Sequence, residues 1–284
     1  MQAIEREVSD LYGSLWMELE SFQRPEVLEQ FLYNVDLPAS WFESKDALDA
    51  GCGSGFAVWA MSELGAKCSA IDLDQKNLDL ARRKTGVTDA EFKQASVLDI
   101  PYADCSFDFV HCNGVLHHTT DPLRGFSELV RVTRPGGILF VSLYGRGGIA
   151  NAALAVGRSV SKIVPGSLSA RILDILVGTR KLPNSFMPLK VSILDNLYVP
   201  IRRSFRAKDV EEMFAKAGFS DVTRTQTTIF DHTNALNKLA FGEGCLQFRG
   251  VSKRARDRTD WRMERTARCG QPSRVRPGLQ SRLG

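Results

Sequence analysis

A loop with glycine at every second position is the feature that most constrains the fold of this chain. Residues 48–55 read LDAGCGSG, and an apolar, helix-compatible run, FAVWAM, follows at 56–61. Glycine has no Cβ atom, so this backbone can turn sharply and a ligand can approach its amides closely. The first N–H groups of the following helix lack intrahelical partners and face the same ligand. The pattern predicts a site for a nucleotide-like cofactor at the end of a strand.

The residues around the loop favour one cofactor class over two others. The dinucleotide fingerprint G-x-G-x-x-G requires a third glycine, and Phe56 stands in its place. Asp49 would repel the pyrophosphate that a dinucleotide places at the positive helix N-terminus. A P-loop is excluded because no Gly-Lys-Ser/Thr follows the glycines. S-adenosylmethionine has no phosphate, and a carboxylate attracts its ammonium group, often through water. The loop therefore predicts S-adenosylmethionine.

A second strand ends in another carboxylate. Residues 67–71 read as this strand, and Asp72 follows it about 20 residues after Gly51, the distance expected of a carboxylate that receives both ribose hydroxyls. That spacing fits NAD equally well. The alternative is that Asp72 caps the helix expected at 75–84, but Asp74 fits the capping role better. Ribose binding is therefore assigned to Asp72.

Three further segments continue the alternation of strands and helices. A short strand near 91–94 is followed by Asp99, which could accept a hydrogen bond from the adenine amino group or start a turn before the next proline. A buried strand at 107–110 runs out at Asn113 and a pair of histidines. An Arg-Pro-Gly-Gly turn then leads into a fifth strand at 138–143. Such alternation predicts a three-layer, mostly parallel α/β sheet.

With these motifs the chain resembles the class I S-adenosylmethionine-dependent methyltransferases, and within them the type 11 group of ubiquinone- and menaquinone-biosynthesis-like enzymes. The resemblance covers about residues 45–145 and is specific for fold and cofactor. It implies a doubly wound, mostly parallel, seven-stranded Rossmann-like sheet. The acceptor is poorly specified, because this group methylates quinone precursors, sterols, sugars, polyketides and other small molecules. The motifs are DAGCGSG at 49–55, IDLD at 71–74, LDIP at 98–101, FDFV at 107–110, NGVLHH at 113–118 and RPGG at 134–137.

The resemblance also implies how the cofactor is held. The glycine loop would wrap the methionine part, Asp72 would hold the ribose, and Asp99 with Ile100 would frame the adenine. The residues predicted to contact S-adenosylmethionine are Asp49, Gly51, Cys52, Gly53, Gly55, Asp72, Leu73, Asp99, Ile100 and Asn113.

Two adjacent histidines are the candidate catalytic residues. The sulfonium methyl is a strong electrophile, so alignment of the acceptor supplies much of the acceleration, and a base is needed only if the acceptor loses a proton. His118 is the preferred base and His117 the second candidate, although a histidine that only orders the loop is the alternative. Tyr144, after the fifth strand, is predicted to line the acceptor pocket. A metal site is rejected because His111 and Cys112, adjacent on a strand, point to opposite faces.

The chain is expected to have three parts. An N-terminal helical segment (1–45) precedes the methyltransferase domain (46–250), which contains a helical lid insertion at 146–205. A basic tail follows at 251–284. Open α/β folds bind ligands at the carboxyl edge of the sheet, which the lid would cover.

Local patterns complete the expected fold of the domain. Asp121 is a fitting N-cap for a helix whose apolar face includes Leu123. A helix around 210–217 stops at the following glycine. The alternating segment 219–229 and the segment 245–250 are expected to form a terminal antiparallel pair.

The lid insertion is apolar with interspersed basic residues. Helices are expected at 149–163 and 168–177, separated by a Pro-Gly pair. This composition suits an apolar or anionic small substrate. Docking on a membrane surface is the second interpretation, and a helical pair that only packs on the core is the third.

Charge separates the tail from the rest of the chain. Nine Arg and one Lys against three acidic residues give the tail a charge of +7, whereas residues 1–250 carry −3. The tail is expected to be disordered. It could bind RNA or anionic lipid, but a dispensable extension is favoured, so nucleic acid is not the expected partner.

Three further features of the sequence predict a cytoplasmic protein. No run reaches the ~18 apolar residues of a membrane helix, and the first residues lack the apolar core of a signal peptide. The six cysteines form no CxxC pair, and a reducing compartment is the simplest.

The sequence therefore predicts a cytoplasmic, metal-independent methyltransferase that uses S-adenosylmethionine to methylate a small molecule at O, N or C. Three alternatives stay open. The first is an RNA-modifying methyltransferase that uses the tail. The second is a nicotinamide oxidoreductase, disfavoured by Asp49 and Phe56. The third is a non-catalytic protein that keeps the cofactor fold.

Overall fold

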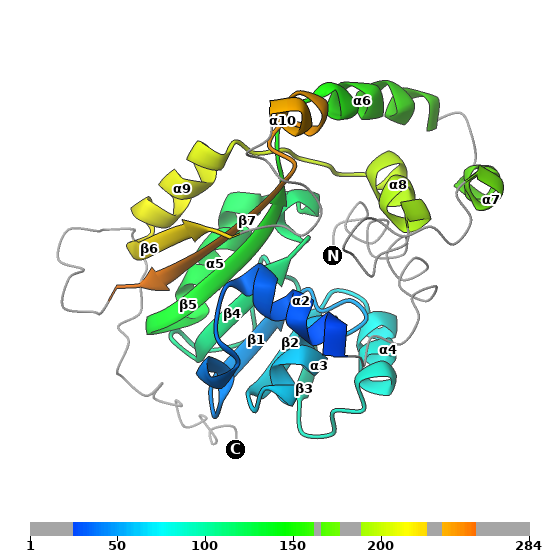
Figure 1. The fold of residues 1–284 in the computed structure, drawn as a ribbon. Coiled ribbons are helices and arrows are strands. Elements are labelled where there is room, and N and C mark those ends of the chain that lie inside the picture. The colour runs from blue at the N-terminus through cyan, green and yellow to red at the C-terminus, as the bar shows by residue number, and fades with distance from the viewer. Residues whose placement is uncertain (1–24, 162–165, 177–188, 226–234, 254–284) are drawn as a thin grey trace, which may run out of the picture.

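Seven strands form one sheet in a computed structural model of the chain, which describes residues 25–161, 166–176, 189–225 and 235–253 (Figure 1). The strand order is β3-β2-β1-β4-β5-β7-β6. Strands β1 to β5 pair in parallel, and β7 runs antiparallel between β5 and β6. The predicted doubly wound sheet with a terminal antiparallel pair is confirmed. Its strands are β1 Asp46–Ala50, β2 Lys67–Asp72, β3 Glu91–Gln94, β4 Phe107–Asn113, β5 Thr133–Tyr144, β6 Phe219–Arg224 and β7 Cys245–Ser252.

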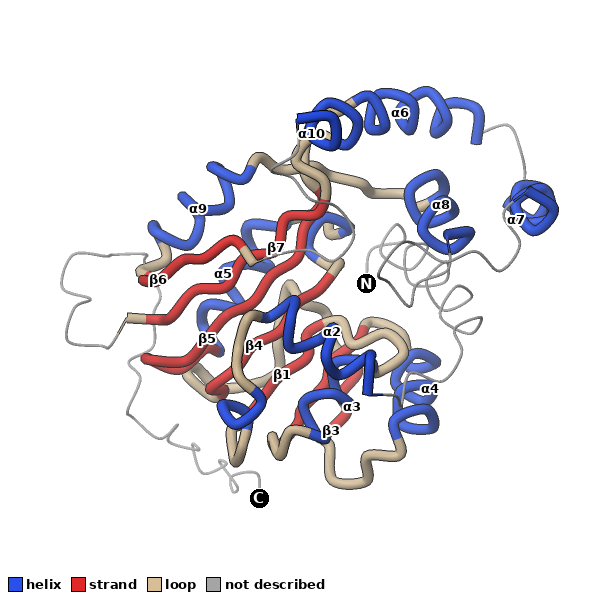
Figure 2. Tube along the Cα trace, in the orientation of Figure 1, coloured by secondary structure: helices blue, strands red, loops and turns tan. Residues whose placement is uncertain are grey.

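Helices cover both faces of the sheet, which makes the three layers (Figure 2). Successive side chains of a strand point to opposite faces, so Phe109 belongs to one apolar cluster and Val110 to the other. The first cluster joins the sheet to α2 (Pro25–Val35), the 3-10 helix η1 (Ala39–Phe42), α3 (Phe56–Glu63) and α4 (Gln75–Thr85), and the second joins it to α5 (Pro122–Val132) and α9 (Ala207–Lys216).

The strand order reverses between β1 and β4. From β1 the chain builds outward through β2 and β3, and it then returns to place β4 and β5 on the other side. In open α/β sheets, ligands bind at such a switch point, outside the carboxyl ends of the strands. The glycine loop follows β1 and Asn113 ends β4. Two features found in the sequence therefore meet at the switch point.

Two helix caps confirm the expected local chemistry. Asp74 accepts a hydrogen bond from the Lys76 amide at 2.9 Å and begins α4. Asp121 does the same for the Arg124 amide at 3.0 Å and begins α5. The prediction that Leu123 lies on the buried face was wrong, because its side chain is 61% exposed. At 100° per residue it lies roughly 130° from the centre of the stripe that α5 buries.

Strand β5 begins earlier than expected. It starts at Thr133, which pairs with Phe107, and not at Ile138 after a separate turn. The pairing register between β4 and β5 shifts once, between Phe107 and Phe109. A Cβ on Gly137 would lie 2.8 Å from the carbonyl oxygen of Asp108. The Arg-Pro-Gly-Gly segment therefore runs tightly alongside β4.

Four helices lie beyond the carboxyl end of β5 (Figure 1). The predicted lid helices at 149–163 and 168–177 correspond to α6 and α7, whereas α8 and α10 were not predicted. Prolines at 188 and 200, which are typical of helix ends, stand on either side of α8 in the sequence. We call α6, α7, α8 and α10 the lid layer, with bounds α6 Ile149–Ser161, α7 Gly166–Leu176, α8 Leu189–Tyr198 and α10 Ala235–Phe241.

Several predictions fall on parts of the chain outside the described residues. These are most of the N-terminal segment, the end of the strand expected at 219–229, and the basic tail beyond 253. Within the described ranges, no helix combines the length and apolarity that crossing a bilayer requires.

Candidate functional site

The glycine loop after β1 adopts a backbone that favours glycine. Gly51, Gly53 and Gly55 have φ of 87°, 51° and 87°, in the left-handed region that other residues rarely adopt. A Cβ on Gly51 would lie 2.4 Å from Cγ2 of Val115, and one on Gly55 would lie 2.7 Å from Cγ2 of Thr85. The turn and the close packing of its neighbours both require glycine at these positions.

Four amides of this loop donate within the protein. The N–H groups of Gly51 and Cys52 donate to the carbonyl oxygen of Ile71 at 2.8 and 3.0 Å. The Gly55 amide donates to the Cys52 carbonyl at 2.8 Å, and the Gly53 amide donates to the carboxylate that ends β2 at 2.9 Å. A phosphate-binding loop instead presents its N–H groups to the anion. The loop is therefore poorly suited to a pyrophosphate.

Asp72 is that carboxylate, and it is held in place beside the loop. Its Oδ2 accepts the Gly53 amide, and its Oδ1 accepts bonds from the Asp74 amide and the Asn77 side chain, both at 3.0 Å. Burial raises the pKa of Asp72, while the three hydrogen bonds act in the opposite direction. The structure thus fixes Asp72 at the carboxyl edge and leaves helix capping to Asp74.

Asp49 pairs with a histidine that the sequence did not connect to it. Its Oδ1 lies 2.8 Å from Nδ1 of His111, and both side chains are buried. The His111 ring stacks on Phe140 with the planes 4° apart. The two residues are 62 positions apart in sequence and become neighbours only because β4 pairs with β1. Among the described residues, no group of three His, Cys, Asp or Glu side chains is arranged to hold a metal.

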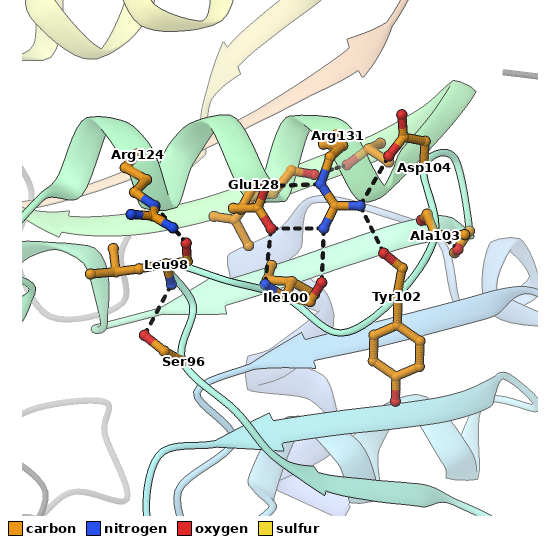
Figure 3. A network of polar contacts seen from close by, with 12 residues as sticks. Ser96, Leu98, Ile100, Tyr102, Ala103, Asp104, Arg124, Glu128 and Arg131 are labelled. Atoms are coloured by element: carbon orange, nitrogen blue, oxygen red, sulfur yellow. Dashed lines mark hydrogen bonds and ion pairs between the residues drawn. The ribbon is translucent and has the colours of Figure 1, made fainter. Parts of the chain in front are cut away.

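Helix α5 holds the segment 95–104 that follows β3 (Figure 3). The Arg131 guanidinium donates to the carbonyl oxygens of Ile100 and Tyr102 at 2.8 and 2.7 Å. Glu128 pairs with Arg131 at 2.7 Å and accepts the Ile100 amide at 2.9 Å. Charge-assisted hydrogen bonds of this kind are stronger than neutral ones. They fix the path of this segment along the carboxyl edge of the sheet, where the cofactor is predicted to bind.

The two residues expected to frame the adenine lie in different surroundings. Asp99 is exposed, whereas Ile100 is buried and its amide is already bound to Glu128. The segment leaves β3 with the Ala95 amide bonded to the carbonyl of Asp72 at 2.9 Å. The residues next to Asp72 are therefore Gln94, which pairs with it, and Ala95. Asp99, the predicted partner of the adenine amino group, lies four residues further along the chain.

Three other predicted contacts lie along the same edge. Leu73 is half-buried, and its carbonyl accepts a bond from the Gln94 side chain at 2.9 Å. Asn113 is exposed at the end of β4. Cys52 is buried, and burial, followed by the charges of two nearby carboxylates, raises the pKa of its thiol well above the ordinary value. Cys52 is therefore a neutral group in the wall of the loop.

The two candidate histidines lie in the short helix η2 (Leu116–His118) after β4. The His117 ring centroid lies 4.1 Å from that of His118 and 3.9 Å from that of Tyr144. Neither ring nitrogen of His117 has a hydrogen-bond partner among the described residues. Burial, then the charges of His118 and Arg202, lowers the pKa of His117 well below its ordinary value. His117 is therefore a neutral, packed ring.

The lid layer supplies partners to the other two predicted residues. The Tyr144 hydroxyl donates to Oδ2 of Asp195 in α8, and Nε2 of His118 lies 3.8 Å from the other oxygen of that carboxylate. Arg202, after α8, lies 4.7 Å over the Tyr144 ring and donates to Asn151 of α6 at 2.8 Å. The sequence did not single out Asp195 or Arg202, because no motif links them to residues so distant along the chain.

Comparison with known proteins identifies the domain. Residues 48–141 match the family described as a methyltransferase domain. Ubiquinone biosynthesis O-methyltransferase of Paracidovorax citrulli is 32% identical over 46% of this chain and 57% of its own length. Demethylmenaquinone methyltransferase of Clavibacter sepedonicus is 32% identical over 43% and 54%. A tRNA U34 carboxymethyltransferase of Nautilia profundicola is 35% identical over 37% and 36%. The chain thus spans at most about three fifths of these relatives.

Solved structures agree on the fold. A chain from the complex of the Haloferax volcanii Trm112 methyltransferase activator with a methyltransferase has a TM-score of 0.54 at 16% identity, over 89% of this chain and 99% of that one. A S-adenosylmethionine-dependent methyltransferase of Thermotoga maritima has a TM-score of 0.51 at 17% identity, over 87% and 100%. Residues 48–141 therefore form a methyltransferase domain, and the relatives that they match include a ubiquinone biosynthesis O-methyltransferase and a demethylmenaquinone methyltransferase.

Proposed function

We propose that this protein transfers the methyl group of S-adenosylmethionine to a small-molecule acceptor. The observation that carries the proposal is the glycine loop, whose amides at Gly51, Cys52, Gly53 and Gly55 already donate within the protein. Such a loop offers little to a diphosphate. It sits at the switch point beside the carboxylate of Asp72, where ligands bind in sheets of this topology.

The proposed cofactor contacts follow from this geometry. Asp72 is to receive the ribose hydroxyls, and the glycine loop is to surround the methionine part. Asp49 contributes negative charge from within the sheet, held by His111 at 2.8 Å. Asn113 and Leu73 lie at the same edge. For the adenine ring, the segment that α5 pins after β3 is the proposed wall, with Asp99 at its exposed side and Ile100 at its buried side.

A small molecule is the proposed acceptor because one related enzyme is named for ubiquinone biosynthesis and another for demethylmenaquinone. The relative named for tRNA modification keeps an RNA acceptor as the second candidate. The lid layer favours the first, since exposed apolar side chains gather on its helices and small-molecule sites are lined mainly by apolar side chains. Tyr144 is proposed to line the acceptor site. The predicted tail begins within β7, at residues 251 and 252, and the rest of it beyond residue 253 lies outside the described residues.

The lid layer is also the proposed contact with a lipid surface. Among the described residues, ten large apolar side chains are exposed, and eight of them lie on α6, α7 and α10. The insertion 146–205 carries nine Lys and Arg against two acidic residues. Apolar groups combined with positive charge are what an anionic bilayer surface binds. The eight are Ile149, Val156, Leu168, Ile172, Ile175, Leu176, Leu236 and Leu239.

Calorimetric titration of the full chain with S-adenosylmethionine, S-adenosylhomocysteine and NAD tests the cofactor class. We expect the first two ligands to bind and NAD not to bind. Binding of NAD in place of the sulfonium donor would refute the proposal. A cell extract with methyl-labelled donor then tests transfer, and labelled RNA in place of a labelled small molecule would establish the second candidate.

A further inference from the structure

A buried polar cluster joins the lid layer to the end of the sheet. It consists of His118 from η2, Tyr144 from β5 and Asp195 from α8. The carboxylate lies within hydrogen-bond distance of the tyrosine and within ion-pair distance of the histidine, and the two rings contact each other edge to face. We propose that His118 is the base of the methyl transfer, that Asp195 positions and charges it, and that the acceptor is a hydroxyl compound. This inference rests on the proposed function and adds to it a residue from the lid and a class of acceptor.

The hydrogen bond of the other ring nitrogen sets the tautomer of His118. Nδ1 lies 2.7 Å from the carbonyl oxygen of Ile201, and a carbonyl oxygen only accepts hydrogen bonds. Nδ1 therefore carries the proton in the neutral ring, and Nε2 carries the lone pair. A base needs its lone pair on the nitrogen that meets the substrate. In His118 the lone pair is on Nε2, the nitrogen that faces Asp195.

The carboxylate of Asp195 faces the same nitrogen. Its Oδ1 lies 3.8 Å from Nε2, too far for a direct hydrogen bond but close enough for a charge to act. Its Oδ2 accepts the hydroxyl of Tyr144, which keeps Oδ1 turned to His118. An uncharged Nε2 beside a carboxylate places two acceptors opposite each other. A proton arriving on Nε2 converts this contact into an attraction.

The charged groups around His118 pull in both directions. Burial lowers the pKa of His118, and the Arg202 and Arg158 guanidinium groups lower it further, while the Asp195 charge and the Ile201 carbonyl raise it. His117 and Tyr144 complete the surroundings as neutral rings. The lowered pKa keeps the His118 ring neutral at pH 7, and Asp195 offsets part of the cost of charging it.

The proton balance of the reaction defines the acceptor class. As the acceptor oxygen attacks, the S–CH₃ bond breaks and its electron pair stays on sulfur, which becomes a neutral thioether. The O–CH₃ bond forms while the O–H proton moves to Nε2, which leaves an imidazolium ion beside Asp195. A neutral amine can attack before it loses its proton and needs no such base. A hydroxyl needs one, which is why this unit points to a hydroxyl acceptor.

The position of Asp195 couples this chemistry to the lid. Arg158 of α6 donates to the carbonyl oxygens of Asn196 and Val199 at 2.9 and 2.7 Å, which fixes the end of α8. Only with α8 docked in this way does Asp195 reach the end of β5. The sheet alone supplies the base, and the lid supplies its counter-charge.

Histidine NMR on the full-length protein tests the unit without any acceptor. The chain has four histidines, and the His118→Gln variant assigns the signal. We expect the Nδ1–H tautomer for His118. The pKa of His118 should shift down in Asp195→Asn, which removes the charge that raises it, and up in Arg202→Gln, which removes one that lowers it. Glu211→Gln, an exposed acid on α9, is the matched control and should leave it unmoved.

The His118–Asp195 pairing, the hydroxyl acceptor and the binding of S-adenosylmethionine are tested by different measurements. An Nε2–H tautomer, or a His118 pKa that ignores both substitutions in variants that melt cooperatively, overturns the pairing with Asp195 even if S-adenosylmethionine binds. In the labelled-donor extract, a methyl ether is the expected product and an N-methyl or C-methyl product overturns the hydroxyl acceptor. Failure of the wild-type chain to bind S-adenosylmethionine would refute the proposed function itself and is measured independently.

Discussion

The glycine loop and the end of β2 are held by contacts close in sequence, whereas the acceptor side of the sheet edge is held by contacts between distant parts of the chain. The glycine loop and the end of β2 bond to each other within residues 51–77. At the other side, Tyr144 bonds to Asp195 and His118 to Ile201, across 51 and 83 residues. The first side forms with the sheet. The second depends on the insertion folding over it, so damage to either should have a distinct signature.

The largest expected effect is on the cofactor side, in Gly51→Ala. The new Cβ would lie 2.4 Å from Val115 in a backbone with φ of 87°. The left-handed conformation costs roughly 1–2 kcal/mol and overpacking about 1–3 kcal/mol more. We expect unfolding free energy from chemical denaturation to fall by about 3 kcal/mol, and S-adenosylmethionine binding to be lost in calorimetry.

Gly86→Ala is the matched control for this change. Gly86 also has a positive φ, of 66°, but a Cβ there meets no atom within 4 Å. Only the backbone cost should remain, roughly 1 kcal/mol, with cofactor binding unchanged. Equal losses in the two variants would show that packing against Val115 is not what the loop requires.

Asp72→Asn tests the same side with a smaller change. The carboxylate accepts three hydrogen bonds within the protein, and an amide can accept at only one of its two positions. A ribose hydroxyl that no longer donates to a charged oxygen loses about 1.5–3 kcal/mol of binding free energy. We expect the Kd for S-adenosylmethionine to rise roughly 30-fold in calorimetry.

Asp74→Asn isolates the role of charge from that of capping. Asn is as good an N-cap as Asp, and Asp74 serves as the cap of α4. Because the two residues cap helices about equally well, the Kd for S-adenosylmethionine should stay within about twofold of the wild-type value. A loss as large as that of Asp72→Asn would indicate that the cofactor is held by the whole acidic pair.

The difference between the two sides also explains what the sequence could predict. The loop, the caps at Asp74 and Asp121 and the strands of the parallel sheet follow from glycine chemistry, capping and apolar runs over a few residues. The Asp49–His111 pair arises only when β4 pairs with β1. Helix α8 and Asp195 were missed for the same reason, since prolines signal breaks but not where the segment between them docks.

On the acceptor side, the buried histidines predict a pH dependence of stability. The pKa of His117 is lowered by burial, so below about pH 6.5 the unfolded chain binds a proton that the folded one does not. The contribution of the neutral, buried histidine to the free energy of unfolding is then fully present above that pH. It is lost as the pH falls, with a slope that approaches about 1.4 kcal/mol per pH unit for each such histidine. Asp72 has a raised pKa and acts in the opposite sense, losing stability as the pH rises through its titration.

Chemical denaturation at several pH values between 7.5 and 5.5 measures this slope. In His117→Phe, the aromatic ring keeps its contact with Tyr144 and the titration disappears. The loss of unfolding free energy between pH 7.5 and 5.5 should therefore be smaller by about 1.4 kcal/mol in total. An unchanged slope would mean that His117 takes up its proton in the folded state, contrary to its burial.

The smallest expected effect concerns the outer surface of the lid layer. Ile175 is 85% exposed on α7, and on a bilayer it would bury part of that apolar surface. At ~25 cal/mol per Å², Ile175→Ser should weaken sedimentation with vesicles of phosphatidylglycerol by about fivefold. Leu123→Ser removes another exposed apolar side chain, 61% exposed, from α5 outside the lid layer and should have no effect. Because both substitutions lie on the outside, cofactor affinity should be unchanged in both. Equal binding by the two variants, or equal binding to neutral phosphatidylcholine, would show that the apolar and basic surface of the lid does not serve lipid contact.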